Sequence, residues 1–289
     1  HCLSSAASDV YKRQNIDHAN SHSSFQDKVS MSNLCQEITL PTVPLQHIDG
    51  DGEIALCILS AINVGTLKDL DELEELCEVA VRALDEIIDY QNYPVTAAEI
   101  STKARRSLGI GYIGLAHYLA KNQVKYGDKG AIKVVHELTE AFQYYLIKAS
   151  VELAKEKGKC EYFDRTKYAK GELPIDHYKK DLDEVCSVKM KKNWDKLRKE
   201  IAEFGMRNST LSAQMPSESS SVVSNATNGI EPPRGFLSVK KSKKGPLKQI
   251  VPDYSRLKNF YTLLWDMPNN DGYINCLLYT SDAADDKQC

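Results

Sequence analysis

The chain has 289 residues, of which 42% are hydrophobic and 27% charged, and its formal net charge is -3. This length is enough for one large domain or two ordinary ones with a buried core. A charge so close to neutral argues against electrostatic capture of nucleic acid or of an acidic membrane surface. The sequence contains neither an apolar run long enough to span a membrane nor a basic-then-apolar signal pattern. We therefore expect a cytoplasmic globular protein.

The two ends differ in character from the rest of the chain. Residues 1–13, HCLSSAASDVYKR, begin with His rather than Met and show no periodicity, and residues 276–289, CLLYTSDAADDKQC, are equally out of character. We expect both to be non-native tails. Residues 14–275 are then expected to contain the fold.

The first part of that range is expected to be a loop followed by extended chain. NIDHANSHSSF, residues 15–25, is polar and rich in turn residues. His18 and His22 stand four apart, but no third ligand lies near them in sequence, so hydrogen bonding is favoured over a metal site. SNLCQEITLPT, residues 32–42, is typical of extended chain. EIALCILSAINVG, residues 53–65, predicts a strand buried on both faces with Cys57 in its middle.

Helical patterns dominate the middle of the chain. One runs from a cap at Asp69 until Tyr93 and Pro94 stop it, and a second covers residues 98–121. A third ends at Gly158. Two shorter amphipathic stretches cover residues 178–186 and 194–204.

GIGYIG, residues 109–114, fits the dinucleotide-binding pattern G-x-G-x-x-G. That fingerprint needs a strand immediately before it, whereas STKARRSL precedes it within a helical pattern. The glycines are therefore interpreted as allowing one helix to pack closely against its neighbours.

Residues 205–235 are rich in Ser, Asn, Gly and Pro, carry almost no charge and contain single apolar residues. This composition favours ordered active-site loops over a flexible linker. Within them, MPSESSS has the composition of a helix start, since Pro216 precedes hydroxyls and a carboxylate. An ordinary capped helix and a phosphate site both fit. FLSVKKSKKGPLKQIVPDYSRL then predicts a hairpin and a helix running to Trp265.

In extended chain, Asn33, Cys35 and Glu37 would project from the same face. A carboxylate can accept a proton from a substrate, but beside a thiol it raises the thiol pKa and disfavours a thiolate. Cys35 is therefore better suited to chemistry as a neutral S–H or a sulfur radical. Chance spacing explains the triplet equally well.

Eight cysteines occur without a C-x-x-C pair, so a cytosolic chain should keep most of them reduced. The simplest interpretation of each is a small buried hydrophobe. They are Cys2, Cys35, Cys57, Cys77, Cys160, Cys186, Cys276 and Cys289.

Together these segments resemble the large (alpha) subunit of class I, aerobic ribonucleoside-diphosphate reductase, from about residue 15 to residue 275. The matching motifs are HANSHSSF, SNLCQEITLPT, GEIALCILSAINVG, RRSLGIGYIGLAHYLAK, YAKGELPIDHYKKDL, RNSTLSAQMPSESSS, SNATNGIEPPRG and MPNNDGY. The family signature is met by Trp194, Leu197, Gly205, Met206, Arg207, Asn208, Ser212, Ala213 and Pro216.

The resemblance implies roles for individual residues. Cys35 would become a thiyl radical and abstract the ribose 3′-hydrogen, while Glu37 takes the 3′-hydroxyl proton and Asn33 holds the sugar hydroxyls. Cys57 would be one of two cysteines that supply electrons and form a disulfide. Backbone N–H groups of Glu218, Ser219 and Ser220 would hold the substrate diphosphate, in a binding segment that also includes Pro216 and Ser217. Cys77, Cys160 and Cys186 match no functional position.

The implied fold is α/β and helix-rich, part of a ten-stranded α/β barrel with a central active-site loop. The implied partners are a ribonucleoside diphosphate substrate, a metal-containing small (beta) subunit that supplies the radical, and a second large subunit in a homodimer. Thioredoxin or glutaredoxin would be the reductant, and dNTP or ATP effectors would bind a region N-terminal to this sequence. No cofactor or metal is expected within these residues.

The family's second redox cysteine, its radical-transfer tyrosine pair and its C-terminal cysteines find no match here. We therefore expect a fragment without turnover of its own. Two alternatives stay open: a related thiyl-radical barrel driven by cobalamin or a glycyl radical, and a nucleotide-binding or assembly module without catalysis.

Overall fold

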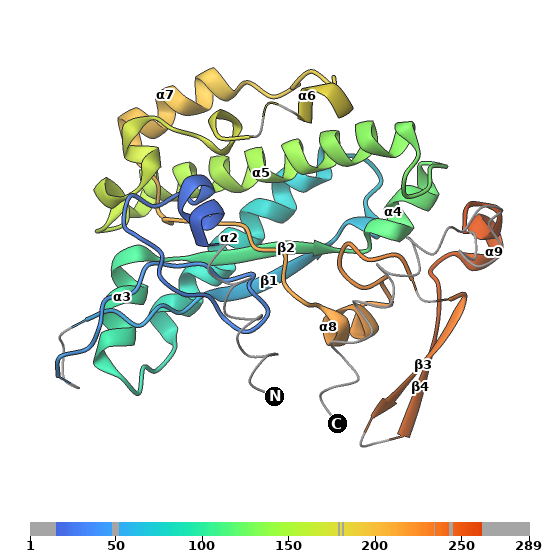
Figure 1. The fold of residues 1–289 in the computed structure, drawn as a ribbon, viewed down its shortest axis with the longest axis horizontal. Coiled ribbons are helices and arrows are strands. Elements are labelled where there is room, and N and C mark those ends of the chain that lie inside the picture. Colours follow the sequence, from blue (N-terminus) through green and yellow to red (C-terminus); the bar gives the residue numbers. More distant parts are fainter. Residues whose placement is uncertain are drawn as a thin grey trace.

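The computed structural model describes residues 16–47, 52–178, 180, 182–233, 235–242 and 245–261. Most of these residues lie in helices and connecting loops (Figure 1). The strands are β1 (Ile58–Asn63), β2 (Leu108–Ile113), β3 (Leu237–Ser242) and β4 (Gly245–Ile250). The α-helices are α2 (Glu72–Tyr90), α3 (Thr96–Arg105), α4 (Leu115–Lys121), α5 (Lys129–Lys157), α6 (Leu182–Val185), α7 (Trp194–Phe204), α8 (Glu218–Val223) and α9 (Tyr254–Leu257). Short 3-10 helices are η1 (Val64–Thr66), η2 (Phe163–Arg165), η3 (Lys167–Lys170), η4 (Pro174–Asp176) and η5 (Lys258–Phe260).

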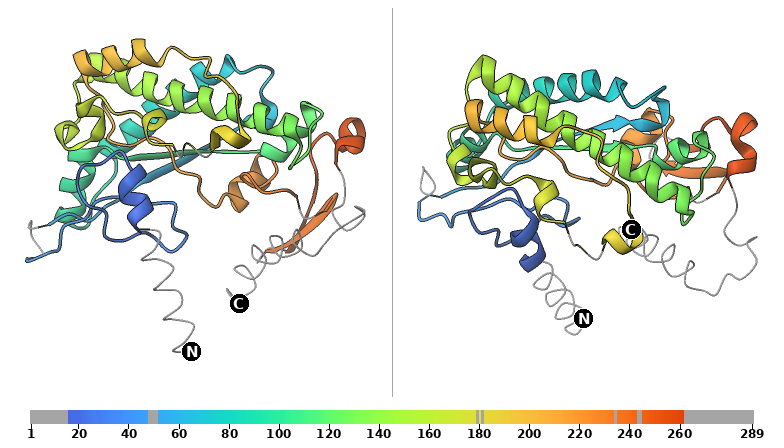
Figure 2. Two further views of the ribbon diagram at one scale, coloured as in Figure 1. Left: turned by 45° about the horizontal axis from the view of Figure 1, so that its top comes forward. Right: turned by 90° about the horizontal axis from the view of Figure 1, so that it is seen from above.

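A parallel pair of strands forms the centre of the structure. β1 and β2 pair in register from Ile58 opposite Leu108 onward. On the other side of β2, the Ile110 N–H donates to the Leu211 carbonyl at 2.8 Å, and Ala213 donates back to Ile110 at 3.2 Å. Helices α2, α5 and α7 lie on one side of these strands, and the N-terminal loops and α8 lie on the other (Figures 1 and 2).

The helical side contains the main hydrophobic core. In α2, buried residues recur at helical spacing and face α5; they are Leu73, Cys77, Val81, Leu84 and Ile88. The N-cap of α2 is Asp71 rather than the predicted Asp69, although Asp69 Oδ1 accepts the backbone N–H groups of Asp71 and Glu72 at 2.9 and 3.2 Å. α5 ends before Gly158, whose φ of 84° lies in the left-handed region.

The prediction of one helix over residues 98–121 is wrong. Arg106 takes a left-handed conformation with φ of 49° and ends α3, and β2 and α4 follow. In β2, Leu108 and Ile110 point into the core while Gly109 and Gly111 alternate with them. This period of two is that of a strand, and pairing with β1 overrides the helical pattern on either side.

Other expectations need correction as well. Residues 16–22 are helical rather than loop. Cys57 precedes β1 instead of lying in its middle, and β1 is only partly buried because one face turns away from the helices. The β3–β4 hairpin is confirmed. The helix after it ends at Leu257, and Trp265 lies outside the described residues.

A buried ionic cluster joins α2 to the segment before α8. Asp85 is fully buried and accepts hydrogen bonds from Arg106 Nε at 2.7 Å, Asn208 Nδ2 at 3.1 Å and Arg207 Nε at 3.2 Å. Asp89, one turn further along α2, also binds Arg106 but is exposed at its surface end. Of the described helices, none is long and apolar enough to cross a membrane.

Replacing Asp85 by Ala should destabilise the fold strongly, since it removes the fully buried carboxylate that Arg106, Arg207 and Asn208 share. We expect a loss of about 3–5 kcal/mol in the free energy of unfolding, measured by urea titration. Asp89→Ala is the matched control, because it removes a more exposed partner of Arg106 and should cost about 1 kcal/mol or less. Equal losses for the two variants would contradict this account.

Candidate active site

The segment that carries Cys35 forms a tight turn. Gln36 N–H donates to the Asn33 carbonyl at 3.2 Å, and Gln36 has a φ of 65°. The Asn33 side chain accepts the Ile38 N–H at 3.0 Å, and the Asn33 N–H donates to the Ile38 carbonyl at 3.3 Å. The prediction of extended chain with three side chains on one face is therefore wrong. Asn side chains compete for local backbone groups, and here that competition closes a loop.

The turn separates the three predicted residues. Cys35 lies exposed at its tip, whereas Asn33 and Glu37 are half-buried. The Glu37 Oε2 atom is buried and finds no hydrogen-bond partner among the described residues. An unpartnered carboxylate oxygen at this depth is costly to bury, and it is available to accept a proton or a hydrogen bond.

Glu37 acts electrostatically on Cys57. Burial, and secondarily the negative charge of Glu37, raise the pKa of the Cys57 thiol from 9.0 to about 12. The fold therefore brings Glu37 close enough to Cys57 for their charges to interact, although the two residues lie on different segments of the chain. Cys57 is a neutral thiol at any physiological pH, not a thiolate nucleophile.

The Cys57 sulfur lies against β2. A Cβ placed on Gly109 would be 2.7 Å from this sulfur. Because Leu108 and Ile110 face the helical core, Gly109 faces the side of the loops. Cys57 therefore lies on the side of the strands away from α2 and α5.

The predicted helix start at MPSESSS is confirmed as the beginning of α8, with Ser217 as its N-cap. The buried Ser217 hydroxyl donates to Asn228 Oδ1 at 3.2 Å, and the Ser220 hydroxyl donates to the Ser217 carbonyl at 3.0 Å. Glu218, Ser219 and Ser220 are exposed, as is Pro216.

Gln214 fixes the approach to α8. Its side-chain amide pairs with the backbone of Tyr112, donating to the carbonyl at 2.9 Å and accepting the N–H at 3.4 Å. A Cβ on Gly111 would lie 3.0 Å from the Met215 sulfur, so this segment crosses the same face of β2 as Cys57. Gln214, Gly109 and Gly111 were missed in the sequence; the alternation in LGIGYI was the signal for the glycines.

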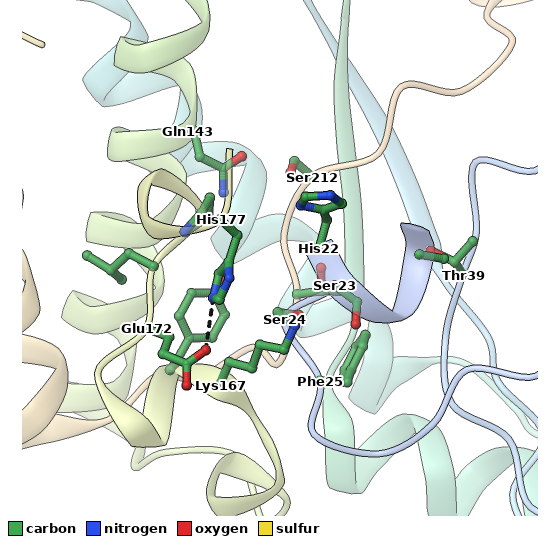
Figure 3. Close-up of a pocket in the computed structure, with 15 residues that line it drawn as sticks. His22, Ser23, Ser24, Phe25, Thr39, Gln143, Lys167, Glu172, His177 and Ser212 are labelled. Atoms are coloured by element: carbon green, nitrogen blue, oxygen red, sulfur yellow. Dashed lines mark ion pairs between the residues drawn. The ribbon is translucent and has the colours of Figure 1, made fainter. Parts of the chain in front are cut away.

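A separate cavity of about 310 Å³ opens beside the helical residues 16–22 (Figure 3). His177 Nε2 lies 2.9 Å from Glu172 Oε2 across one wall. Lys167 Nζ donates to the carbonyls of Asn20 and Ser21, and burial lowers the Lys167 pKa. Its lining is Ala19, His22, Ser23, Ser24, Phe25, Thr39, Gln143, Lys167, Tyr168, Glu172, Leu173, Pro174, His177, Thr210 and Ser212. It does not include the predicted site residues.

His18 and His22 lie one turn apart on the helical segment 16–22, and both are exposed. In the part of the chain that the structure describes, no group of three or more His, Cys, Asp or Glu is arranged to hold a metal ion. The five cysteines within the described residues are free thiols: Cys35, Cys57, Cys77, Cys160 and Cys186. Cys2, Cys276 and Cys289 lie outside the described residues.

A family model for the barrel domain of ribonucleotide reductase matches residues 10–268. The chain belongs to this family. It is therefore part of an α/β barrel, and the described strands form two separate pairs rather than a closed barrel. The resemblance inferred from the motifs is confirmed, whereas the domain limits at residues 14 and 275 and the roles of individual residues stay predictions.

Curated relatives agree with the family assignment. The ribonucleoside-diphosphate reductase alpha subunit of Haemophilus influenzae is 61% identical over 91% of this chain, and that of Buchnera aphidicola subsp. Schizaphis graminum is 59% identical over 90%. The alpha subunit of ribonucleoside-diphosphate reductase 1 from Escherichia coli is 57% identical over 90% of the chain. The chain spans 35% of the length of each of these relatives.

Glu37→Gln should lower the Cys57 pKa, because it removes the nearby negative charge while burial stays. A fall of about half a unit would increase the thiolate fraction at pH 9 about threefold, so Cys57 should be alkylated faster by that factor. Peptide mass spectrometry after timed iodoacetamide treatment measures it. Cys77, whose pKa is raised by burial alone, is the internal control. An unchanged Cys57 rate would show that Glu37 does not act on the thiol.

Stability should fall at alkaline pH. Burial raises the pKa of Cys77 and of Cys160 from 9.0 to about 12. Above pH 9 the unfolded chain loses these protons while the folded chain keeps them, so the stabilisation is complete below pH 9 and is lost toward pH 12. Each thiol contributes a slope of about 1.4 kcal/mol per pH unit. The free energy of unfolding, measured by urea titration between pH 8 and pH 11, should fall less steeply with pH in Cys77→Ala, by about 1.4 kcal/mol per pH unit. An unaltered slope would contradict the effect assigned to Cys77.

Proposed function

We propose that the full-length protein containing this sequence reduces ribonucleoside diphosphates to 2′-deoxyribonucleoside diphosphates by thiyl-radical chemistry. The observation that carries the proposal is the placement of Glu37 beside the neutral thiol of Cys57, on the face of β2 crossed by the approach to α8. The names of relatives 57–61% identical to this chain support the same reaction.

Cys35 is proposed to act as the radical. As a thiyl, it takes the 3′-hydrogen atom of the ribose and becomes S–H, leaving a carbon-centred radical at C3′. Glu37 accepts the 3′-hydroxyl proton, and the 2′-hydroxyl departs as water after it takes one of the two protons that the dithiol pair supplies. Asn33 is suited to hold the sugar hydroxyls, because its Oδ1 is occupied by Ile38 and its Nδ2 donates no hydrogen bond within the described residues.

Cys57 is proposed to supply reducing equivalents. With a second cysteine from outside this chain it gives two electrons and two protons and forms a disulfide, so the sum is one diphosphate and two thiols giving one deoxynucleotide, one disulfide and water. Thioredoxin or glutaredoxin would reduce that disulfide, and the Cys35 hydrogen returns to C3′ at the end of the cycle. A neutral Cys57 thiol suits this role because it carries both the proton and the electron that are transferred.

The substrate diphosphate is proposed to lie at the start of α8. Main-chain N–H groups of Glu218, Ser219 and Ser220 would bind it, with Pro216 and Ser217 shaping the turn. These residues are exposed or small, which leaves room for phosphate oxygens. The proposed site then extends from the Cys57 face of β2 to the start of α8.

Further parts of the proposal concern the whole protein. A metal-containing small subunit would supply the radical, two large subunits would form a dimer, and dNTP or ATP effectors would bind outside these residues. The relatives' name, subunit alpha, supports the existence of a second kind of subunit. A thiyl radical must be kept from water, so we propose that other barrel segments cover the exposed Cys35 tip in a cytoplasmic holoenzyme.

Cys35→Ser in the full-length subunit should abolish deoxynucleotide formation, since a hydroxyl cannot hold the radical. We expect a loss of at least about a thousandfold, measured by conversion of radiolabelled CDP with the small subunit and a dithiol reductant. Cys186→Ser is the matched control, because Cys186 is a half-buried thiol with no proposed role, and it should retain activity. Full activity in Cys35→Ser would show that Cys35 does not carry the reaction, and would favour a nucleotide-binding or assembly role for this stretch of the subunit.

A further inference from the structure

The alternating glycines of β2 have different neighbours on the face opposite the core. A Cβ on Gly109 would meet Leu59 Cδ2 at 2.5 Å, the Cys57 sulfur at 2.7 Å and Ala213 Cβ at 3.1 Å. A Cβ on Gly111 would instead meet the Ala213 carbonyl at 2.5 Å and the Met215 sulfur at 3.0 Å. Only the first of these glycines borders the thiol.

Backbone conformation does not explain glycine at position 109. Its φ is not in the left-handed region, so an alanine could adopt the same strand geometry. Glycine inside a strand is unfavourable by about 0.5–1 kcal/mol relative to alanine, because it loses more conformational freedom on folding. The reason for glycine must therefore be the space that its missing side chain leaves.

Three groups border that space, and Ala213 Cβ, at 3.1 Å, is the least crowded of them. The other two differ in how easily they can move. Leu59 is 40% exposed and its clashing atom is the far end of a flexible side chain. Cys57 is half-buried and has one rotatable bond to its sulfur, so it can make way only by turning the sulfur to another rotamer. A side chain at position 109 would therefore exclude the Cys57 sulfur from its present position.

We propose that Gly109 is a positioning residue whose missing side chain lets the Cys57 sulfur lie flat against β2, in the place from which it reacts. The proposal rests on the proposed function only in taking Cys57 as a redox cysteine. The location of the sulfur itself is a property of this chain, and it can be tested without turnover.

The first experiment measures the reactivity of Cys57 in the 289-residue chain carrying Gly109→Ala. The displaced sulfur should lose burial and move away from Glu37, so its pKa falls, and one unit corresponds to about tenfold faster alkylation at pH 9. Rates are read by peptide mass spectrometry as the ratio of Cys57 to Cys77, so that a global loss of structure does not mimic the effect. Gly235→Ala is the control, because a Cβ there would have only the Leu237 carbonyl nearby, at 3.7 Å, and it should leave the ratio unchanged.

The second experiment is a double-mutant cycle with Cys57→Ala, which removes the sulfur. Gly109→Ala should lower the thermal midpoint, and the loss should be at least halved in the Cys57→Ala background. If Gly109→Ala alone does not fold, folding of the double variant supports the proposal. Leu59→Ala combined with Gly109→Ala relieves the clash with Leu59 and should still show fast Cys57 alkylation.

An unchanged or slower Cys57 rate in a folded Gly109→Ala chain overturns the proposal. So does an equal loss of thermal midpoint with and without the Cys57 sulfur, or a failure of the double variant to fold. None of these results bears on whether the full-length subunit makes deoxynucleotides. Conversely, a full-length subunit that forms no deoxynucleotides would contradict the proposed function without changing the conclusion about Gly109.

Discussion

The placement of the Cys35 loop depends on one buried guanidinium. Arg105, at the end of α3, is 2% exposed; its Nε lies 2.7 Å from Glu53 Oε2 and its Nη2 lies 2.9 Å from Asp27 Oδ2. Asp27 precedes the loop and Glu53 follows it, so the Arg105 side chain holds both ends, and the more exposed Arg165 pairs with the same two carboxylates at 2.7 and 3.3 Å. The rings of Phe25 and Tyr162 lie 5.8 and 5.2 Å from the same guanidinium, which adds cation–π attraction. A buried charge that meets two carboxylates tolerates few other arrangements, so the loop has a defined base even though its tip is exposed.

The next residue, Arg106, forms its ion pairs on the opposite side of the strands. Arg106 ends α3 in the left-handed conformation and binds Asp85 of α2, so consecutive arginines serve the loop side and the helical side of the strands. Asn208 completes the second cluster by donating to Asp85 and to the Arg106 carbonyl at 3.1 and 3.0 Å. The start of β2 is thereby fixed between two ionic clusters. This explains how a strand forms where helical patterns stand on both sides, and why its glycines face a thiol at a fixed depth.

Sequence reasoning was sound for the long helices and for the start of α8, where periodicity and capping residues act locally. It failed where a distant partner decides the conformation. LGIGYI becomes a strand because β1 and the chain around Leu211 offer backbone partners, which no local pattern shows. The Cys35 segment forms a turn because the Asn33 side chain accepts the nearby backbone N–H of Ile38. In extended chain, Asn33, Cys35 and Glu37 would instead have projected from one face. The family could be identified despite both errors, since the motifs carry chemistry and order along the chain rather than secondary structure.

The turn also changes which thiol feels the carboxylate. A glutamate beside a cysteine favours a neutral S–H; the sequence suggested this for Cys35, but in the structure it holds for Cys57, whose pKa is raised by burial and by Glu37. In the proposed reaction this division is chemically sensible. Cys57 must keep its proton until electrons leave with it, and a nearby carboxylate that repels a thiolate enforces that state. In that proposed reaction Glu37 would serve twice, by accepting a proton from the sugar and by keeping the Cys57 sulfur protonated.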